Sequence, residues 1–182
     1  WVTLGQSYGG FLTLAYLSAF PGAARASFVC GGIPHVPASA DEVYARTFPR
    51  MAAKTRLLYE RYPQDEERLS LLADRAAAGD LTLPDGSPLT VRRLQSLGQG
   101  LGMKPGHERL HNLLDLAFAA GDGSAAAALD AAGGDPARVE VSPAFLAGVW
   151  SATNVVANPL YWVLQELIYA DGELERPVAW AA

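Results

Sequence analysis

A serine flanked by two glycines directly follows the first apolar run of this sequence. Residues 1–4 predict a short buried strand, residues 5–9 read GQSYG, and residues 11–20 predict an apolar helix that ends at a Pro-Gly pair. A GxSxG motif between a strand and a helix is typical of a nucleophile elbow, a sharp turn that exposes the serine hydroxyl above a parallel sheet. This motif constrains the fold most, because it requires strand, turn and helix in that order.

The residues of the motif have separate predicted roles. Ser7 is the candidate nucleophile, in a strained backbone conformation. Gly5 and Gly9 are expected to leave room where a Cβ would clash. The backbone N–H of Tyr8, at the start of the helix, is the candidate oxyanion donor, because the first amides of a helix have no intrahelical partner.

The rest of the sequence predicts two unlike regions. A second apolar run at residues 26–30 completes a strand, helix, strand unit with a parallel sheet, so the fold class is α/β, with a partial core in residues 1–33. Residues 34–182 change to alanine, leucine and arginine in helical periodicity and predict a mostly α-helical domain. The expected helices are 41–61, 64–78, 90–101, 106–120, 124–132, 142–153 and 159–170.

Composition narrows the function classes. The net charge of −5 provides no basic surface, so nucleic acid is an unexpected partner. No apolar stretch is as long as the roughly 18 residues of a membrane span, so no membrane partner is predicted. The single cysteine, Cys30, cannot form an intrachain disulfide, which favours a cytoplasmic location. Because the chain begins inside a predicted strand, we expect it to be a fragment.

A second motif indicates a different chemistry. The stretch HERLH at residues 107–111 matches HExxH, in which two histidines one helical turn apart bind zinc. A catalytic zinc needs a third protein ligand, and the acids that follow fall in or beside predicted loops. The alternative is a polar helix start with Glu108 near the positive end of the helix dipole and His111 partly buried. We therefore predict no metal.

Several stretches together resemble one protein family. GQSYGGF and YLS near the start, then GGIP, RYPQD, LPDGSPLT, HERLH and NPLYWVLQELIYADG, follow in the order typical of the proline iminopeptidase (prolyl aminopeptidase) family of α/β-hydrolases. The resemblance extends over nearly the whole chain. It implies a Ser, Asp, His triad in that order, no cofactor, and a helical cap domain that here would be residues 34–182.

The same resemblance implies that the acid and the histidine of the triad lie beyond the cap, outside this chain. We interpret His35 as a loop residue at the cap entrance, since the family order places the acid before the histidine. His107 and His111 would belong to the cap. The isolated chain is therefore expected to be inactive, as a fragment without its triad Asp and His.

The resemblance implies that an acidic residue of the cap binds the substrate amine, and Glu166 is the best candidate here. Trp162 and Tyr169 share its predicted helix face, so carboxylate and aromatic rings would suit a pyrrolidinium group. Gln165 stands where many relatives would have histidine. The implied partner is a peptide with a free amino-terminal proline, and the sequence predicts no oligomeric state.

Three other functions stay open at this point. An esterase or amidase of the same fold would use the same elbow, since the fold does not determine the acyl substrate. A non-catalytic binding module could keep the hydrolase fold. A zinc peptidase using HERLH is the least favoured.

Overall fold

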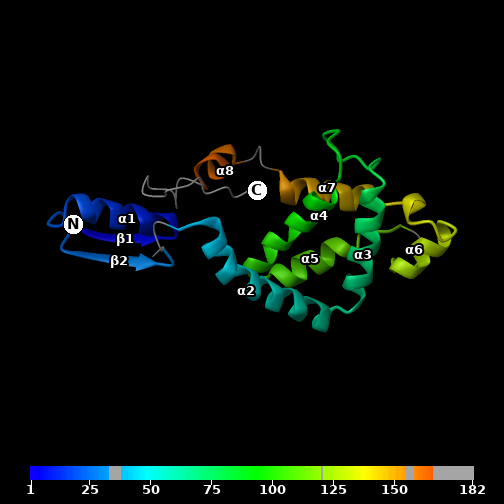
Figure 1. Ribbon diagram of the computed structural model, residues 1–182, viewed down its shortest axis with the longest axis horizontal. Helices are drawn as coiled ribbons and strands as arrows, with labels where there is room; N and C mark the ends of the chain where they lie inside the picture. Colours follow the sequence, from blue (N-terminus) through cyan, green and yellow to red (C-terminus); the bar gives the residue numbers. More distant parts are fainter. Residues whose placement is uncertain (33–37, 120, 155–157, 166–182) are drawn as a thin grey trace. The chain divides into compact units, whose positions relative to one another are not determined.

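The structure is a computed structural model that describes residues 1–32, 38–119, 121–154 and 158–165 (Figure 1). The chain forms two compact units. The first comprises Trp1–Ala45 with Asn158–Ala182, and the second comprises Arg46–Ala157. Each unit is described by itself.

The first unit contains the predicted strand, helix, strand arrangement. Strand β1 (Val2–Gln6) leads into helix α1 (Tyr8–Ala19), and strand β2 (Ala26–Cys30) follows. The strands pair in parallel, with Val2 opposite Ala26 and Gln6 opposite Cys30. Helix α1 contacts both strands. The chain thus combines helices with a small parallel sheet, as expected of a partial α/β fold. Helix α8 (Pro159–Gln165) also belongs to this unit.

The described part of the first unit leaves much apolar surface open. Trp1 is 95% exposed, Leu4 74% and Phe28 60%. The sheet in the described residues has two strands, so each strand has one edge without a neighbour. A two-stranded sheet is at most marginally stable by itself. The described part of this unit therefore has strands and helices in place but little closed apolar core.

The described residues of the second unit are mainly helical, and the predicted domain bounds of 1–33 and 34–182 stay a prediction. Its long helices are α2, which begins in the first unit, and α3, and the remaining helices are shorter. Their bounds are α2 Ala40–Arg61, α3 Gln64–Ala77, α4 Val91–Gln95, η1 Ser96–Gly102, α5 Gly106–Leu114, α6 Ala125–Ala131, η2 Pro136–Arg138 and α7 Pro143–Thr153.

Hydroxyl side chains define where three of these helices begin. Thr90 precedes α4, Ser124 precedes α6 and Ser142 precedes α7, and each side-chain oxygen accepts a hydrogen bond from a backbone N–H in the first turn. Such N-caps satisfy amides that have no intrahelical partner. The local sequence thus accounts for these starts.

The cluster of buried apolar residues in the described part of the chain lies in the second unit. Leucines of α2, α3 and α5 belong to the same buried cluster as Phe145 of α7, and the largest fully buried apolar side chains include Leu58, Leu72, Leu114 and Phe145. All members of this buried cluster fall between residues 58 and 149. The helices of this unit are therefore held by a shared core.

Two helix predictions were too long. The expected helix 90–101 is α4 followed by the 3₁₀ helix η1. The expected helix 106–120 ends at Leu114, because the next residues leave the helix and pair with a distant segment. Phe118 bridges to Val141, and the amide of Ser142 donates to the carbonyl of Ala117. Ala117 is fully buried in this pairing, so tertiary contacts outweigh helix propensity.

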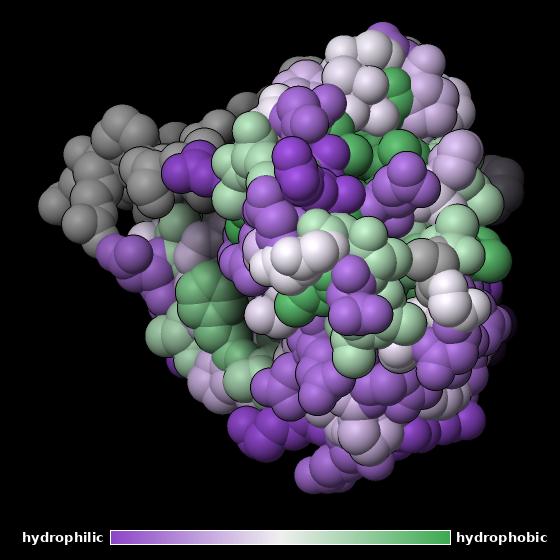
Figure 2. Space-filling model, turned by 90° about the vertical axis from the view of Figure 1, so that its right-hand side faces the viewer, coloured by the Kyte–Doolittle hydropathy of each residue, from purple (hydrophilic) through white to green (hydrophobic). Residues whose placement is uncertain are grey.

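The surface has both polar and apolar areas. The face shown in Figure 2 carries mainly hydrophilic residues, with hydrophobic residues in small areas between them. None of the helices in the described part of the chain is long and apolar enough to cross a membrane.

Candidate active site

Ser7 lies at the sharp turn between β1 and α1. Its φ is 52° and its ψ is −120°, and it is the only non-glycine residue with positive φ in the described part of the chain. Its amide donates to the carbonyl of Cys30 at 2.9 Å, and its carbonyl accepts from the amide of Gly10 at 2.8 Å. The backbone on both sides of the serine is thus fixed by the neighbouring strand end and by the helix start.

The Ser7 side chain is exposed and forms no capping hydrogen bond to α1. A serine before a helix would ordinarily cap it with its hydroxyl. Positive φ at a non-glycine residue costs energy and is concentrated at functional sites. Tyr8, the predicted oxyanion donor, is the first residue of α1 and so lies where helix amides have no intrahelical acceptor. The turn therefore presents an exposed hydroxyl, which does not cap the helix, next to the N-terminus of α1.

Glycines allow the backbone segments around Ser7 to approach closely. A Cβ on Gly5 would lie 2.3 Å from the carbonyl oxygen of Gly9, and a Cβ on Gly32 would lie 2.2 Å from the carbonyl oxygen of Ser7. A Cβ on Gly10 would lie 2.7 Å from the Cα of Gly32. The close approach predicted at Gly5 is thus present, and two further glycines share it.

The close approach predicted at Gly9 is not found among the described residues. No described atom lies within 4 Å of a Cβ built there. Gly9 contributes to the turn through its backbone instead, since its carbonyl oxygen is the atom that approaches Gly5 and also accepts from the Thr13 hydroxyl. The described residues give no steric reason for glycine at position 9, so that expectation stays a prediction.

The histidines of HERLH contact different groups. His107 Nε2 lies 2.9 Å from the carbonyl of Lys54, while Glu108 pairs with Arg61. Backbone hydrogen bonding of Glu108 lowers the pKa of its carboxyl, and the hydrogen bond from Arg61 lowers this pKa further. No group of three or more His, Cys, Asp or Glu residues in the described ranges is arranged to hold a metal ion.

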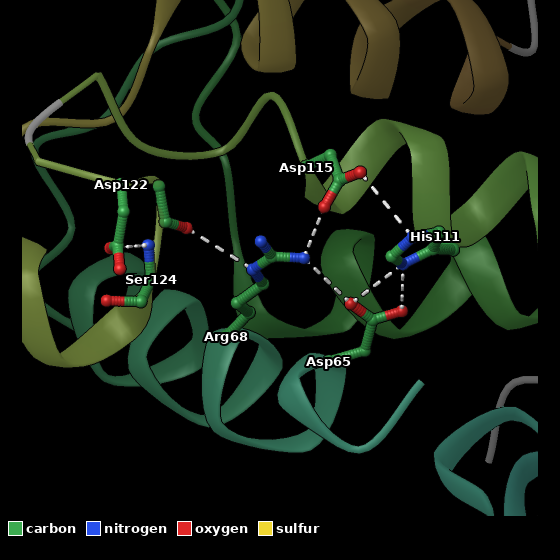
Figure 3. Close-up of polar contacts among 7 residues, drawn as sticks. Asp65, Arg68, His111, Asp115, Asp122 and Ser124 are labelled. Atoms are coloured by element: carbon green, nitrogen blue, oxygen red, sulfur yellow. Dashed lines mark hydrogen bonds and ion pairs between the residues drawn. The ribbon is translucent and has the colours of Figure 1, made fainter. Parts of the chain in front are cut away.

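His111 belongs to a network of charged side chains that joins α3 to α5 (Figure 3). Its Nδ1 lies 3.0 Å from Asp65 and its Nε2 lies 3.5 Å from Asp115. Arg68 bridges the same two carboxylates, at 3.1 Å from Asp65 and 2.6 Å from Asp115. The Tyr62 ring stacks on His111 at a centroid distance of 3.7 Å.

Sequence reasoning missed this network, although its spacing was a usable signal. Asp65 and Arg68 are three residues apart on α3, and Asp115, the C-cap residue of α5, follows His111 by four residues, so each pair lies on one helix face. Asp65 is fully buried and Arg68 nearly so, and buried charges are paired in folded proteins.

The network is poorly suited to general-base catalysis by His111. A general base for a hydroxyl needs one ring nitrogen free to take the proton while the other is oriented by an acid. Both nitrogens of His111 face carboxylates, so this arrangement fits a structural link between helices. Arg68 extends the link to the loop before α6 through the carbonyl of Gly123, at 3.3 Å.

The other predicted site residues lie wholly or partly outside the residues that the structure describes. Trp162 lies in α8, but its side chain is outside the described residues. Glu166 and Tyr169, the candidates for binding the substrate amine, are outside them too, and so is His35. Their grouping stays a prediction from the sequence. Ser7 and the network of His111 belong to different units of the chain.

Comparison with known proteins gives two curated relatives and no family profile. No protein-family profile matches the sequence. A proline iminopeptidase from Aeromonas sobria is 36% identical over all 182 residues, which is 38% of its own length. A proline iminopeptidase from Aspergillus aculeatus is 29% identical over 114 residues, 63% of this chain and 25% of the relative. The chain thus spans well under half the length of the curated relatives it matches.

Proposed function

Because the chain is a homologue of proline iminopeptidases along its whole length, we propose that it forms part of a serine peptidase that releases proline from the amino terminus of peptides. The observation that supports a serine mechanism is the backbone of Ser7, with its positive φ, its exposed side chain and its place between β1 and α1. The likeness to the relatives supports the substrate class. A GxSxG motif in this context is the nucleophile elbow of an α/β-hydrolase.

In the proposed reaction the Ser7 oxygen attacks the carbonyl carbon of the amino-terminal proline. The serine proton passes to a histidine base and then to the leaving amine as the peptide bond breaks. Water hydrolyses the resulting acyl-serine ester, which releases proline and restores the hydroxyl. The Tyr8 amide at the start of α1 would stabilise the negative oxygen of each tetrahedral intermediate.

We assign the histidine base and its acid partner to sequence outside these 182 residues. This assignment is supported by the contacts of His111, whose two ring nitrogens both face carboxylates. It is also supported by His107, whose Nε2 contacts a backbone carbonyl. Residues 34–182 would form the cap that selects the substrate, with Glu166 binding the protonated amine of proline beside the rings of Trp162 and Tyr169.

The test compares the complete gene product with its Ser7→Ala variant. We expect hydrolysis of a proline arylamide by the complete gene product and a loss of roughly 10³-fold or more in kcat for the variant, because a triad without its nucleophile retains little catalysis. The 182-residue chain alone should show no turnover. Full activity in Ser7→Ala would contradict the serine mechanism.

A second substrate separates the peptidase from an esterase of the same fold. Preference for an acyl ester over the proline arylamide, by kcat/KM, would support the esterase or amidase alternative. Glu166→Gln should raise KM for the arylamide, whose amine is charged, and should leave hydrolysis of an uncharged ester unchanged. Equal effects on both substrates would argue against Glu166 as the amine-binding residue.

A further inference from the structure

The second unit contains a partly open pocket, a cavity of about 290 Å³ with a mouth toward solvent, that no step of the proposed reaction uses. Helices α2, α3, α4, η1 and α5 all contribute to its lining. Its walls include five leucines that are buried in the core: Leu58, Leu94, Leu97, Leu101 and Leu110. Buried leucines thus form the inner wall of the pocket, as in most sites that bind small apolar ligands.

Small residues leave this space open. Ala73 of α3 and Gly98 of η1 line it, and a Cβ built on Gly98 would meet no described atom within 4 Å. An apolar cavity of about 150 Å³ in another protein stays dry and binds benzene, and ordinary ligand pockets start at about 300 Å³. The volume therefore suits one or two fused aromatic rings.

The polar groups of the lining limit the charge of a ligand. Tyr59, Thr55 and Gln95 also line the cavity, and the Thr55 hydroxyl already donates to the carbonyl of Met51. Burial raises the pKa of the Tyr59 phenol, and the carboxylates of Glu66 and Asp65 raise it further. The same carboxylates that disfavour a phenolate would repel an anionic ligand.

We propose that this cavity is a binding site for an uncharged aromatic molecule of one or two rings. The leucine walls would take up the rings, and the Tyr59 hydroxyl or the Gln95 amide would form one hydrogen bond with the ligand. Binding would be driven by burial of the aromatic surface in a preformed apolar space. The site goes beyond the proposed peptidase function and does not depend on it.

The test is titration of the chain with indole, followed by NMR of the backbone amides. We expect saturable shifts at Gln95 and Gly98. Ala73→Leu and Gly98→Leu each place carbon atoms in the cavity, so each should weaken binding by about tenfold or more, which corresponds to about 1.4 kcal/mol. Indole-3-carboxylate, which is anionic at pH 7, should bind at least about tenfold more weakly than indole.

The matched control lies in the other unit. Leu12 of α1 lines an apolar hollow on the surface of the first unit. Leu12→Lys should leave indole binding within about twofold of that of the unchanged chain. Circular dichroism would establish that each variant keeps its helices, and two filling variants guard against one that fails to fold. Absence of saturable shifts, binding in both filling variants as tight as in the unchanged chain, binding of the carboxylate as tight as that of indole, or loss of binding in Leu12→Lys would each overturn the proposal.

Discussion

The backbone of Ser7 is the most informative feature at the scale of single residues. Its φ of 52° and ψ of −120° are backbone angles that L-residues with a side chain rarely adopt. Its amide donates a hydrogen bond to the Cys30 carbonyl, and its carbonyl accepts one from the Gly10 amide. These two bonds hold the backbone in this conformation. Such strain costs about 1–3 kcal/mol at a site where the surrounding structure maintains it.

Replacement of Ser7 should therefore separate strain from chemistry. We expect Ser7→Gly to be more stable than Ser7→Ala by about 1 kcal/mol, because glycine adopts positive φ without a steric cost although it gains entropy in the unfolded chain. Denaturant unfolding of the two variants, monitored on the same instrument, measures the difference. Equal stability, or greater stability of the alanine variant, would mean that position 7 is not strained.

The two glycines of the motif provide a matched pair. A Cβ on Gly5 would lie 2.3 Å from the carbonyl oxygen of Gly9, whereas a Cβ on Gly9 meets no described atom within 4 Å. Gly5→Ala should therefore reduce the free energy of unfolding by roughly 1–3 kcal/mol, as overpacking does. Gly9→Ala should change it by less than about 0.5 kcal/mol or stabilise α1 slightly. Denaturant unfolding tests both, and a similar cost at both positions would contradict the geometry.

The motif placed Ser7 correctly between strand and helix, because GxSxG combines a local turn with apolar neighbours on both sides. It did not indicate Gly10 and Gly32, since their contact joins α1 to the end of β2. That approach depends on how two segments pack, which one stretch of sequence does not encode by itself. Local geometry was thus predictable where its causes were local.

At the scale of elements, the network of Asp65, Arg68, His111 and Asp115 joins α3 to α5. Asp65 is fully buried and has two charged or polar partners, while its partner Arg68 also contacts Asp115 and the Gly123 carbonyl. Helix propensity and periodicity predicted both helices but not this connection. The burial of Asp65 and Arg68 depends on how the helices pack, which periodicity does not show.

Removal of Asp65 should consequently be costly. Asp65→Ala leaves Arg68 and His111 without their shared buried carboxylate, and we expect a loss of roughly 2–3 kcal/mol, below the usual 3–5 for a buried pair because Arg68 keeps other acceptors. Arg138→Ala is the control, since the Arg138–Asp135 pair is exposed and should cost less than about 0.5 kcal/mol. Thermal unfolding of both variants measures the contrast. A small effect at Asp65 would mean that the network is not needed for stability.

The ends of elements were predicted less well than their existence. Helix 106–120 was too long because Ala117 and Phe118 carry a helical apolar pattern yet pair with residues 141 and 142. Helix 90–101 was read as one helix, although its second half is 3₁₀. Both differences come from tertiary packing, which outweighs propensities of a few tenths of a kcal/mol per residue.

At the scale of the whole molecule, the described core lies in one of the two units. Its buried members all fall between residues 58 and 149, whereas Trp1, just before β1, and the strand residues Leu4 and Phe28 are exposed. Apolar periodicity predicted the helices that build this core. Their shared packing depends on contacts between distant segments, so it was visible only in the structure.

This uneven distribution predicts that the helical unit can fold by itself. Residues 40–154 include the whole of α2 and every member of the buried cluster, so a chain limited to them should be monomeric and should unfold in one cooperative transition. The 182-residue chain adds the exposed apolar strands, which should increase binding of the dye ANS and promote association. Circular dichroism with denaturant and size-exclusion chromatography test both chains side by side. If residues 40–154 unfolded gradually while the longer chain unfolded cooperatively, stability would have to come from contacts that involve the strands.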